Sequence, residues 1–328
     1  MKVFITGATG FIGTHVVEEL TQAEHDIICL VRKTSQVDKL NKFNVSFCFG
    51  DVTEKVSFLE HMKGCDWVIH LANIYSFWEP NKQNYTEVNI NGTRNVMEAV
   101  LETKVAKVAH ISTVGVYGNT AGETITEETK FPTTHFSEYT RTKYAGDLIA
   151  WELYEKKDLP LVVIYPTAVI GPDDPKPAGQ YIKRLIKGEI PSLAFSDTTI
   201  TFVHVKDVAS AIIKALLKDN NIGEKYIIGK HQLNYKEYSA KICEIAEVPV
   251  PKKEMSNFMA KGIAGLFTVI ANLTKKPPKW DMSTDLVNMM TFGFKADGSK
   301  AERELGIKYT PIEFVLNEAV ASCKKEVG

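Results

Sequence analysis

The chain has 328 residues, a formal net charge of −1 at pH 7 and five cysteines. This length allows a large core, and the near-zero charge gives no electrostatic reason to expect nucleic acid or a membrane as a partner. The cysteines are odd in number, and none forms a CxxC pair or another metal-ligand spacing. We therefore expect reduced thiols, no metal site and a cytoplasmic location.

The N-terminal segment predicts a buried strand, a glycine-rich turn and a helix. The apolar run 3–5 follows the first residues directly, which leaves no room for a signal peptide, and it leads into TGATGFIG at 6–13. We expect Gly7 to permit a tight turn, Gly10 to let backbone approach a diphosphate, and Gly13 to let the helix pack close to its strand. Because the unpaired N–H groups of a first helical turn attract an anion, the segment predicts a dinucleotide diphosphate site.

Strands and helices alternate through the first half of the chain. Apolar runs bounded by turn residues predict strands, and apolar residues at helical spacing predict helices. Since each strand is followed by a helix, we expect an α/β fold with a doubly wound parallel sheet, covered on both faces, and a ligand across the carboxyl ends of its strands. The predicted strands are 3–5, 27–31, 45–49, 67–70, 107–112 and 161–165, and the predicted helices are 12–20, 56–62, 85–102 and 137–156.

The alternation becomes less regular after about residue 170, where 171–179 is a loop rich in turn residues. We predict a dinucleotide-binding domain over 1–170 and a smaller, partly interleaved C-terminal substrate domain over 171–328, with returning sheet segments near 201–230. The longest uncharged apolar segment, 262–273, is shorter than the roughly 20 residues of a spanning helix, so we expect no integral membrane segment. We interpret it as a substrate-domain helix, with a membrane-surface or lipid-binding role as the alternative.

The predicted helix 137–156 carries a tyrosine and a lysine four residues apart, Tyr139 and Lys143. Positions i and i+4 share a helix face, so the phenol and the ammonium should point into one space. A tyrosine has an ordinary pKa of about 10, and an adjacent cation favours the phenolate, so this spacing predicts that Tyr139 is a usable acid or base. An ordinary amphipathic helix also carries this spacing. Two other features add weight: the glycine turn, and Ser112 and Thr113 at the end of the preceding strand.

Together these motifs resemble the extended short-chain dehydrogenase/reductase family of the NAD-dependent epimerase/dehydratase superfamily. The similarity is to its dihydroflavonol 4-reductase-like group and to hopanoid-associated sugar epimerase-like sequences, and it runs from residue 1 to about 309. It implies a Rossmann fold, a nicotinamide cofactor and an oxidoreductase activity. The motifs are TGATGFIG at 6–13, LVRKTS at 30–35, GDVT at 50–53, HLAN at 70–73, VNINGTRNV at 88–96, ISTVGVYG at 111–118, YTRTK at 139–143, YPTAVIGP at 165–172 and FVHVKDVA at 202–209.

The resemblance also implies roles for individual residues. Tyr139 is the catalytic acid/base, Lys143 lowers its pKa and binds the nicotinamide ribose, and Thr113 takes the place of the catalytic Ser/Thr. Asn89 corresponds to the family's asparagine near the central helix, where a packed helix asparagine is the alternative. The other implied cofactor-binding residues are Gly7, Thr9, Gly10, Phe11, Ile12, Gly13, Asp51, Val52, Leu71, Ala72, Asn73, Pro166, Thr167 and Val169; Asn73 replaces the more usual alanine.

The end of the second strand indicates which cofactor is preferred. Relatives that prefer NAD generally place an acidic residue there to bind the ribose hydroxyls, and its charge repels a 2′-phosphate. Here the strand ends in Arg32 and Lys33, without an acid. A guanidinium binds phosphate in bidentate fashion, so we expect NADP(H) to be preferred over NAD(H), with Lys39 as a second contact. Solvated basic residues in a surface loop are the alternative.

We expect an NADP(H)-dependent oxidoreductase that reduces an aldehyde or ketone by hydride transfer, with Tyr139 as proton donor. The family's dehydratases carry an Asp-Glu pair after the catalytic threonine, whereas Val114 and Gly115 follow Thr113 here. A nucleotide-sugar epimerase with tightly bound NAD remains an alternative, although beyond residue 150 only Arg184 and Arg303 are available to clamp a diphosphate. A non-catalytic NADP(H) sensor is a second alternative.

Aromatic residues near the predicted site suggest a hydrophobic substrate pocket for a small molecule. We expect Tyr75, Trp78 and Phe136, together with Thr113, to contact the substrate, and Phe131, Phe195 and the segment 262–273 to add apolar surface. Relatives often dimerise through the two long helices, so we also expect a homodimer formed by 85–102 and 137–156.

Overall fold

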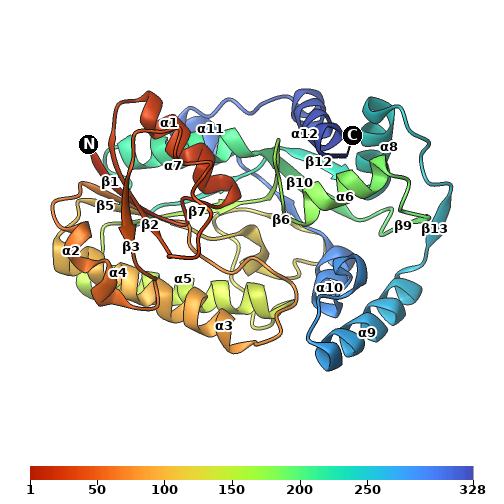
Figure 1. The fold of residues 1–328 in the computed structure, drawn as a ribbon, viewed down its shortest axis with the longest axis horizontal. Helices are drawn as coiled ribbons and strands as arrows, with labels where there is room; N and C mark the ends of the chain where they lie inside the picture. The colour runs from red at the N-terminus through yellow and green to blue at the C-terminus, as the bar shows by residue number, and fades with distance from the viewer. Residues whose placement is uncertain (328) are drawn as a thin grey trace.

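The computed structural model describes residues 1–327. A parallel sheet of seven strands lies at its centre, in the order β11-β7-β5-β4-β1-β2-β3 (Figure 1). The order reverses between β1 and β4, which is where an open α/β sheet binds a ligand beyond the carboxyl ends of its strands. The strands are β1 (Lys2–Thr6), β2 (Asp26–Val31), β3 (Ser46–Phe49), β4 (Trp67–His70), β5 (Lys107–Ile111), β7 (Leu161–Pro166) and β11 (Lys225–Ile228). The doubly wound parallel sheet expected from the sequence is confirmed.

Helices cover both faces of this sheet. The buried residues of α1 (Phe11–Gln22), α7 (Val205–Leu217) and α11 (Ser299–Leu305) form one apolar cluster with one face. Those of α2 (Leu59–Met62), α4 (Thr93–Thr103) and α5 (Glu138–Lys157) pack against the other. Figure 1 shows the two layers above and below the strands. The arrangement explains why the central strands β4, β5 and β7 are almost entirely buried, whereas β3 at the edge is partly exposed.

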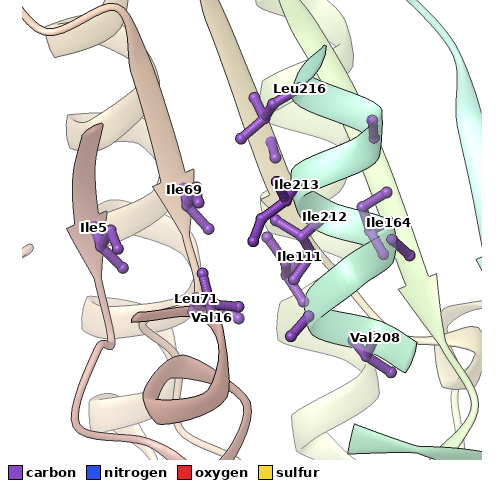
Figure 2. Packing of buried hydrophobic residues seen from close by; sticks show 14 of the residues in the cluster. Ile5, Val16, Ile69, Leu71, Ile111, Ile164, Val208, Ile212, Ile213 and Leu216 are labelled. Atoms are coloured by element: carbon purple, nitrogen blue, oxygen red, sulfur yellow. The ribbon is translucent and has the colours of Figure 1, made fainter. Parts of the chain in front are cut away.

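The central strands interlock with α7. Figure 2 shows Ile212 and Ile213 of this helix at the level of Ile111 and Ile164 of the sheet, with Leu216 and Val208 on the turns above and below them. Every residue of β7 is buried. Burial of such side chains contributes about 1.5–3 kcal/mol each, so this layer is a rigid platform for the loops at the strand ends.

Three elements differ from the sequence prediction. The expected helix 56–62 is split into a 3-10 turn, Lys55–Ser57, and the short α2. The expected helix 85–102 begins as α3 (Gln83–Tyr85), continues as a π-helical segment, Thr86–Gly92, and becomes α4 only afterwards. The strand expected from residue 201 is β10 (Thr199–His204), which lies between β12 (His231–Asn234) and β8 (Ala168–Ile170) in a separate three-stranded sheet.

The remaining elements build a second layer beyond the carboxyl ends of the main sheet. The buried residues of α6 (Pro177–Ile186), α8 (Tyr235–Ala246) and α12 (Ile312–Val327) join β10 in one apolar cluster. These elements are β6 (Thr124–Ile125), β8 (Ala168–Ile170), α6 (Pro177–Ile186), β9 (Ser192–Ala194), β12 (His231–Asn234), α8 (Tyr235–Ala246), β13 (Lys253–Met255), α9 (Asn257–Thr274), α10 (Thr284–Phe292), β14 (Lys295–Ala296) and α12 (Ile312–Val327). Among residues 1–327, no helix combines the length and apolar character needed to cross a bilayer.

Candidate active site

A cavity of about 560 Å³ extends from the glycine turn at the end of β1 to α10. Its walls come from the carboxyl ends of the sheet strands on one side and from the second layer on the other. Tyr139 and Thr113 line it between these two halves. The cavity therefore joins the predicted cofactor site to the predicted proton donor.

The glycine turn has the geometry that its sequence predicts. Gly7 has a φ of +76°, and a Cβ there would lie 2.6 Å from the backbone nitrogen of Ala72. A Cβ on Gly13 would collide with the carbonyl oxygen of Gly7. Gly10 begins α1 without a side-chain cap, so the first N–H groups of the helix are free for an anion. All six residues named for this turn line the cavity: Gly7, Thr9, Gly10, Phe11, Ile12 and Gly13.

Only some of the residues expected around the adenosine line the cavity. Arg32, Asp51 and Val52 line the cavity. Ser35 lines it too, and its Oγ accepts the backbone N–H of Arg32 at 3.1 Å, which holds the hydroxyl against the backbone of Arg32. Lys39 does not line it: its Nζ donates to Asp173 Oδ2 at 3.3 Å in an exposed ion pair. A carboxylate far along the chain thus holds the cation that we expected at a phosphate.

The wall between the strand ends also contains an unsatisfied acceptor. Asn73 donates from Nδ2 to the carbonyl oxygen of Leu71 at 2.8 Å, while its buried Oδ1 has no hydrogen-bond partner. A buried acceptor without a partner costs about 1–3 kcal/mol, so its place on the wall fits a ligand that donates to it. Together with the glycine cradle, it makes this half of the cavity suitable for a dinucleotide. The other expected cofactor residues of this wall also line the cavity, namely Leu71, Ala72, Pro166, Thr167 and Val169.

Tyr139 stands in the first turn of α5, which is fixed by a capping box. Ser137 Oγ accepts the N–H of Thr140 at 3.1 Å, so the helix begins at a defined residue. The Tyr139 ring is 6% exposed and lies 5.0 Å from the ring of Tyr75 and 5.8 Å from that of Phe77. Burial raises the pKa of the phenol well above its ordinary value, and the Thr113 hydroxyl acts in the opposite direction. The phenol is therefore neutral at physiological pH.

Lys143 does not line the cavity and is not among the groups that shift the pKa of Tyr139 in this structure, so its role toward the phenol stays a prediction. Its Nζ donates to the carbonyl oxygen of Ile111 at 2.8 Å. The side chain is 3% exposed, and burial lowers its own pKa to about 8, although the Asp147 carboxylate opposes the change. The shared helix face brings the two groups to one region, but desolvation dominates the titration of both.

A buried polar network beneath the two residues was not predicted. Asp147, one turn after Lys143, accepts from Ser112 Oγ at 2.7 Å and lies 2.9 Å from Nε2 of His110. The His110 ring stacks on that of His70 with centroids 5.4 Å apart. Burial, together with Lys143, lowers the pKa of His110, which keeps the imidazole neutral. The repeat of polar residues at 139, 143 and 147 was the available sequence signal, because it continues one helix face.

Thr113 and Asn89 differ in their distance from the cavity. Thr113 follows β5 and caps a 3-10 turn, Val114–Tyr117, with its Oγ1 accepting the N–H of Gly115 at 3.2 Å. Asn89 lies behind the wall, 1% exposed, and its Oδ1 accepts the N–H of Ile74 at 2.7 Å. Its Nδ2 donates to Thr142 Oγ1 at 3.0 Å. Asn89 thus joins the loop after β4 to α5, as a packed helix asparagine.

The substrate half of the cavity is lined mainly by apolar and aromatic side chains, together with the charged residues Asp174, Lys176, Arg184, Glu189 and Asp281, and only part of it was expected. Tyr75 and Phe195 line it. Trp78 does not: its Nε1 donates to Asn272 Oδ1 on α9 at 2.9 Å. Phe136 stacks on Phe292, with centroids 4.9 Å apart, and lies outside the cavity as well. The sequence did not reveal several apolar and aromatic residues of this wall, among them Phe202, Tyr235, Tyr238, Met282, Leu286, Met289, Met290 and Phe294.

Phe131 and the segment 262–273 also lie outside the cavity. The ring of Phe131 packs on Tyr117, with centroids 4.9 Å apart, beneath the sheet. Arg184 lines the cavity, and its guanidinium donates to the carbonyl oxygen of Trp280 at 2.6 Å and to Asp281 Oδ2 at 2.8 Å. Arg303 bonds to Ser299 on the exposed side of α11. Among residues 1–327, no group of three or more His, Cys, Asp or Glu side chains is arranged to hold a metal.

Comparisons with known proteins agree with this geometry. A protein of Synechocystis sp. named "Putative dihydroflavonol 4-reductase" is 27% identical over 97% of this chain and 93% of its own length. "Sterol demethylase protein B" of Methylococcus capsulatus is 26% identical over 98% of both chains. The crystal structure of gox2253 superposes with a TM-score of 0.86 at 28% identity, covering 99% of this chain and 98% of that one.

A UDP-glucuronic acid 4-epimerase from Bacillus cereus, solved with UDP-glucuronic acid and NAD, superposes with a TM-score of 0.79 at 22% identity, over 99% of this chain and 100% of its own. That likeness shows the shared fold. The sequence profile of the NAD dependent epimerase/dehydratase family matches residues 3–229, well over half of the chain. The chain therefore belongs to this family and is an enzyme of the extended short-chain dehydrogenase/reductase type.

Proposed function

We propose that this enzyme reduces the carbonyl group of an apolar aldehyde or ketone with NADPH, and oxidises the alcohol in reverse. The observation that carries the proposal is the position of Tyr139. Its neutral phenol and the Thr113 hydroxyl lie on the wall of one cavity, between the glycine cradle and an apolar, aromatic half. A neutral phenol suits proton donation to an oxygen that becomes negative.

Each residue of the site has a distinct task in this proposal. The glycine turn and the first turn of α1 bind the cofactor diphosphate, and Lys143 holds the nicotinamide ribose. When bound, the nicotinamide supplies the hydride. Thr113 donates to the substrate oxygen and orients it, and Tyr139 gives that oxygen its proton. The raised pKa of Tyr139 favours return of the proton to the phenolate, which resets the site.

The substrate class follows from the wall of the second half. Aromatic and methionine side chains such as Tyr235, Met282 and Met290 dominate it. The guanidinium in this half, that of Arg184, is engaged by Asp281. A nucleotide-sugar diphosphate would have to break this ion pair, whereas an apolar carbonyl compound only fills the wall.

The test is NADPH consumption over a panel of ketones and aldehydes of increasing apolar size. We expect turnover that rises as the substrate fills the apolar half. Tyr139→Phe should bind NADPH normally and lose about a hundredfold or more in kcat, because the proton donor is gone. Tyr144→Phe, on the same helix, is the matched control and should keep its rate. Near-normal turnover by Tyr139→Phe would remove this residue from its role.

The panel also separates the two alternative functions. Purification with NAD retained, silence toward every carbonyl compound and conversion of nucleotide sugars would indicate an epimerase. Reversible NADPH binding with no activity of either kind would indicate a sensor. Both results contradict the proposal.

Cofactor preference rests on Arg32 and Ser35, which follow β2 and place a cation and a hydroxyl on this wall of the cavity. We predict that NADPH binds at least about tenfold more tightly than NADH, because a 2′-phosphate gains a charge-assisted hydrogen bond from the guanidinium. Fluorescence titration of both cofactors measures this difference. Arg32→Ala should abolish the preference and leave NADH binding unchanged. Equal affinities in the wild type would refute it.

We also propose a cytoplasmic homodimer. The five cysteines are free and buried, which fits a reducing compartment. The predicted dimer helices, α4 and α5, form the outer layer on one side of the sheet (Figure 1). Leu148 of α5 is 48% exposed there.

A further inference from the structure

Helix α9 exposes its large apolar side chains and buries its small ones. Its buried residues are Ala260, Ala264 and Ala271. Phe258 is 89% exposed and Leu273 is 79% exposed. The side chains that define this apolar stripe are Phe258, Met259, Leu266, Val269, Ile270 and Leu273. An ordinary surface helix has the opposite arrangement, so the stripe indicates a surface that binds a partner.

The stripe is continuous and its direction is fixed. At 100° per residue its six members fall within an arc of about 120° along a helix of about 27 Å. The side of α9 opposite the stripe carries the buried alanines, and polar residues beside that side anchor the helix to the body of the protein. Thr268 Oγ1 accepts the N–H of Thr284 at 2.9 Å, and Asn272 Oδ1 accepts from Trp78 at the same distance. Figure 1 shows α9 at the outer edge of the molecule, beside α10.

The charge around the stripe has one sign. Residues 255–280 contain four lysines and no aspartate or glutamate until Asp281. Two exposed aromatic rings border the helix: that of Trp280 packs against Phe267, and that of Phe292 lies under the ammonium of Lys261 at 5.8 Å. The four lysines, all exposed, are Lys261, Lys275, Lys276 and Lys279.

The apolar stripe and the lysines around it together indicate which partner binds this surface. A second copy docked stripe to stripe would bring lysines against lysines, since this segment offers no acid to pair with them. An anionic phospholipid surface meets both features at once, because its headgroups attract lysines while its acyl boundary receives Phe, Leu and Trp. We propose that the apolar stripe docks α9 on the surface of a bilayer containing anionic phospholipids, with the helix parallel to the membrane plane.

The cavity adds support that rests on the proposed function. Met255, just before α9, and Trp280 and Met282, just after it, line the cavity, as does α10. A bilayer bound to α9 would therefore lie against a helix whose flanking segments contribute Met255, Trp280 and Met282 to the apolar wall. This is where a substrate that partitions into lipid is concentrated.

The experiment is sedimentation of the full chain with vesicles, without cofactor or substrate. We expect binding to mixed phosphatidylcholine and phosphatidylglycerol vesicles, weaker binding at high salt, and weaker binding to phosphatidylcholine alone. The triple variant Phe258→Ser, Leu266→Ser, Leu273→Ser should lose about tenfold or more of this affinity, because it removes half of the stripe. These residues are exposed and outside the cavity, so thermal unfolding and activity on a small aldehyde should stay unchanged.

Phe314→Ser is the matched control, since this phenylalanine is 54% exposed on the distant α12. It should bind vesicles as the wild type does. The proposal is overturned if the wild type does not sediment with anionic vesicles or if the triple variant binds equally well. It is also overturned if light scattering shows a wild-type dimer that the triple variant converts to monomer, which would assign the stripe to a second copy. Vesicle binding by a protein that reduces no carbonyl compound would support docking while removing the proposed function.

Discussion

The buried ammonium of Lys143 lowers the stability of the folded protein at neutral pH. Its ammonium is buried against the Ile111 carbonyl oxygen, and its pKa falls to about 8 from an ordinary value of 10.5. The unfolded chain holds that proton more tightly than the folded chain does. Below about pH 8 the folded state therefore bears a desolvated charge, and this cost is relieved as the pH rises from about 8 toward 10.5.

We predict that Lys143→Met raises the free energy of unfolding at pH 7 while it abolishes turnover. The gain should be on the order of 2 kcal/mol, because the variant removes a disfavoured charge and keeps the volume of the side chain. It should shrink as the pH rises above about 8, where the wild type loses its proton. Urea denaturation across this range measures the difference.

Lys156→Met is the control for this prediction. Lys156 lies on the same helix in an exposed pair with Glu152, so its loss should leave the free energy of unfolding close to that of the wild type throughout this pH range. A Lys143→Met protein less stable than the wild type at pH 7 would show that its hydrogen bond and the Asp147 charge outweigh desolvation.

Single residues were predicted well only where a local rule fixed them. At Gly7 and Gly13 the surrounding backbone leaves no room for a side chain, and the spacing of the glycines was enough to predict this. The positions of Trp78 and Lys39 depended on partners far along the chain, Asn272 and Asp173. No local pattern carries such information, so proximity in sequence to the site was a poor guide.

The segment from α3 to α4 shows the same contrast between local pattern and tertiary packing. Its apolar spacing predicted one helix, and the chain does continue helically from Gln83 to Thr103. The π-helical turns Thr86–Gly92 were not foreseen, because they follow from a contact. They place Asn89 where it bonds both to Ile74 and to Thr142 on α5. Such turns often occur at functional sites, where they aim one side chain.

We predict that Asn89→Leu costs about 2 kcal/mol of stability, since it leaves the half-buried N–H of Ile74 without an acceptor and breaks the buried hydrogen bond to Thr142. The loop 74–77 carries Tyr75 and Phe77 against Tyr139, so KM for the carbonyl substrate should rise more than kcat falls. Steady-state kinetics and urea denaturation measure the two effects.

Asn91→Leu supplies the comparison, because Asn91 is exposed in the same turns and bonds only to Glu87. It should change stability by less than about 0.5 kcal/mol and leave KM unaltered. If both leucine variants behave alike, Asn89 has no positioning role.

The molecule as a whole explains what the sequence left open. The sheet could be predicted because a local pattern of apolar and turn residues marks each of its strands and most of its helices. The substrate wall is assembled from Phe202 on β10, Tyr235 on α8, and Leu286 and Met290 on α10, and these three elements lie far apart in sequence. The net charge of −1 was likewise misleading about surfaces, since 255–280 carries only positive charges. Averages over a chain do not describe its faces.

The homodimer is the remaining prediction about the whole molecule, and it uses a different face from α9. Pairing α4 and α5 of two copies would form a four-helix interface on the side of the sheet opposite α1 and α7 (Figure 1). A stable interface buries about 1,600 Å² in total, which two long helices from each copy can supply. Exposed apolar side chains such as Leu148 would lie near its centre.

We predict that Leu148→Glu converts the dimer to a monomer, because it places an unpaired charge in a desolvated interface. Light scattering after size-exclusion chromatography measures the mass directly. Leu217→Glu serves as the control, since Leu217 is equally apolar, is 57% exposed, and ends α7 on the other face of the sheet; it should remain dimeric. A wild-type protein that is monomeric at micromolar concentration would contradict the dimer. A Leu148→Glu protein that keeps the dimer mass would move the interface away from α5.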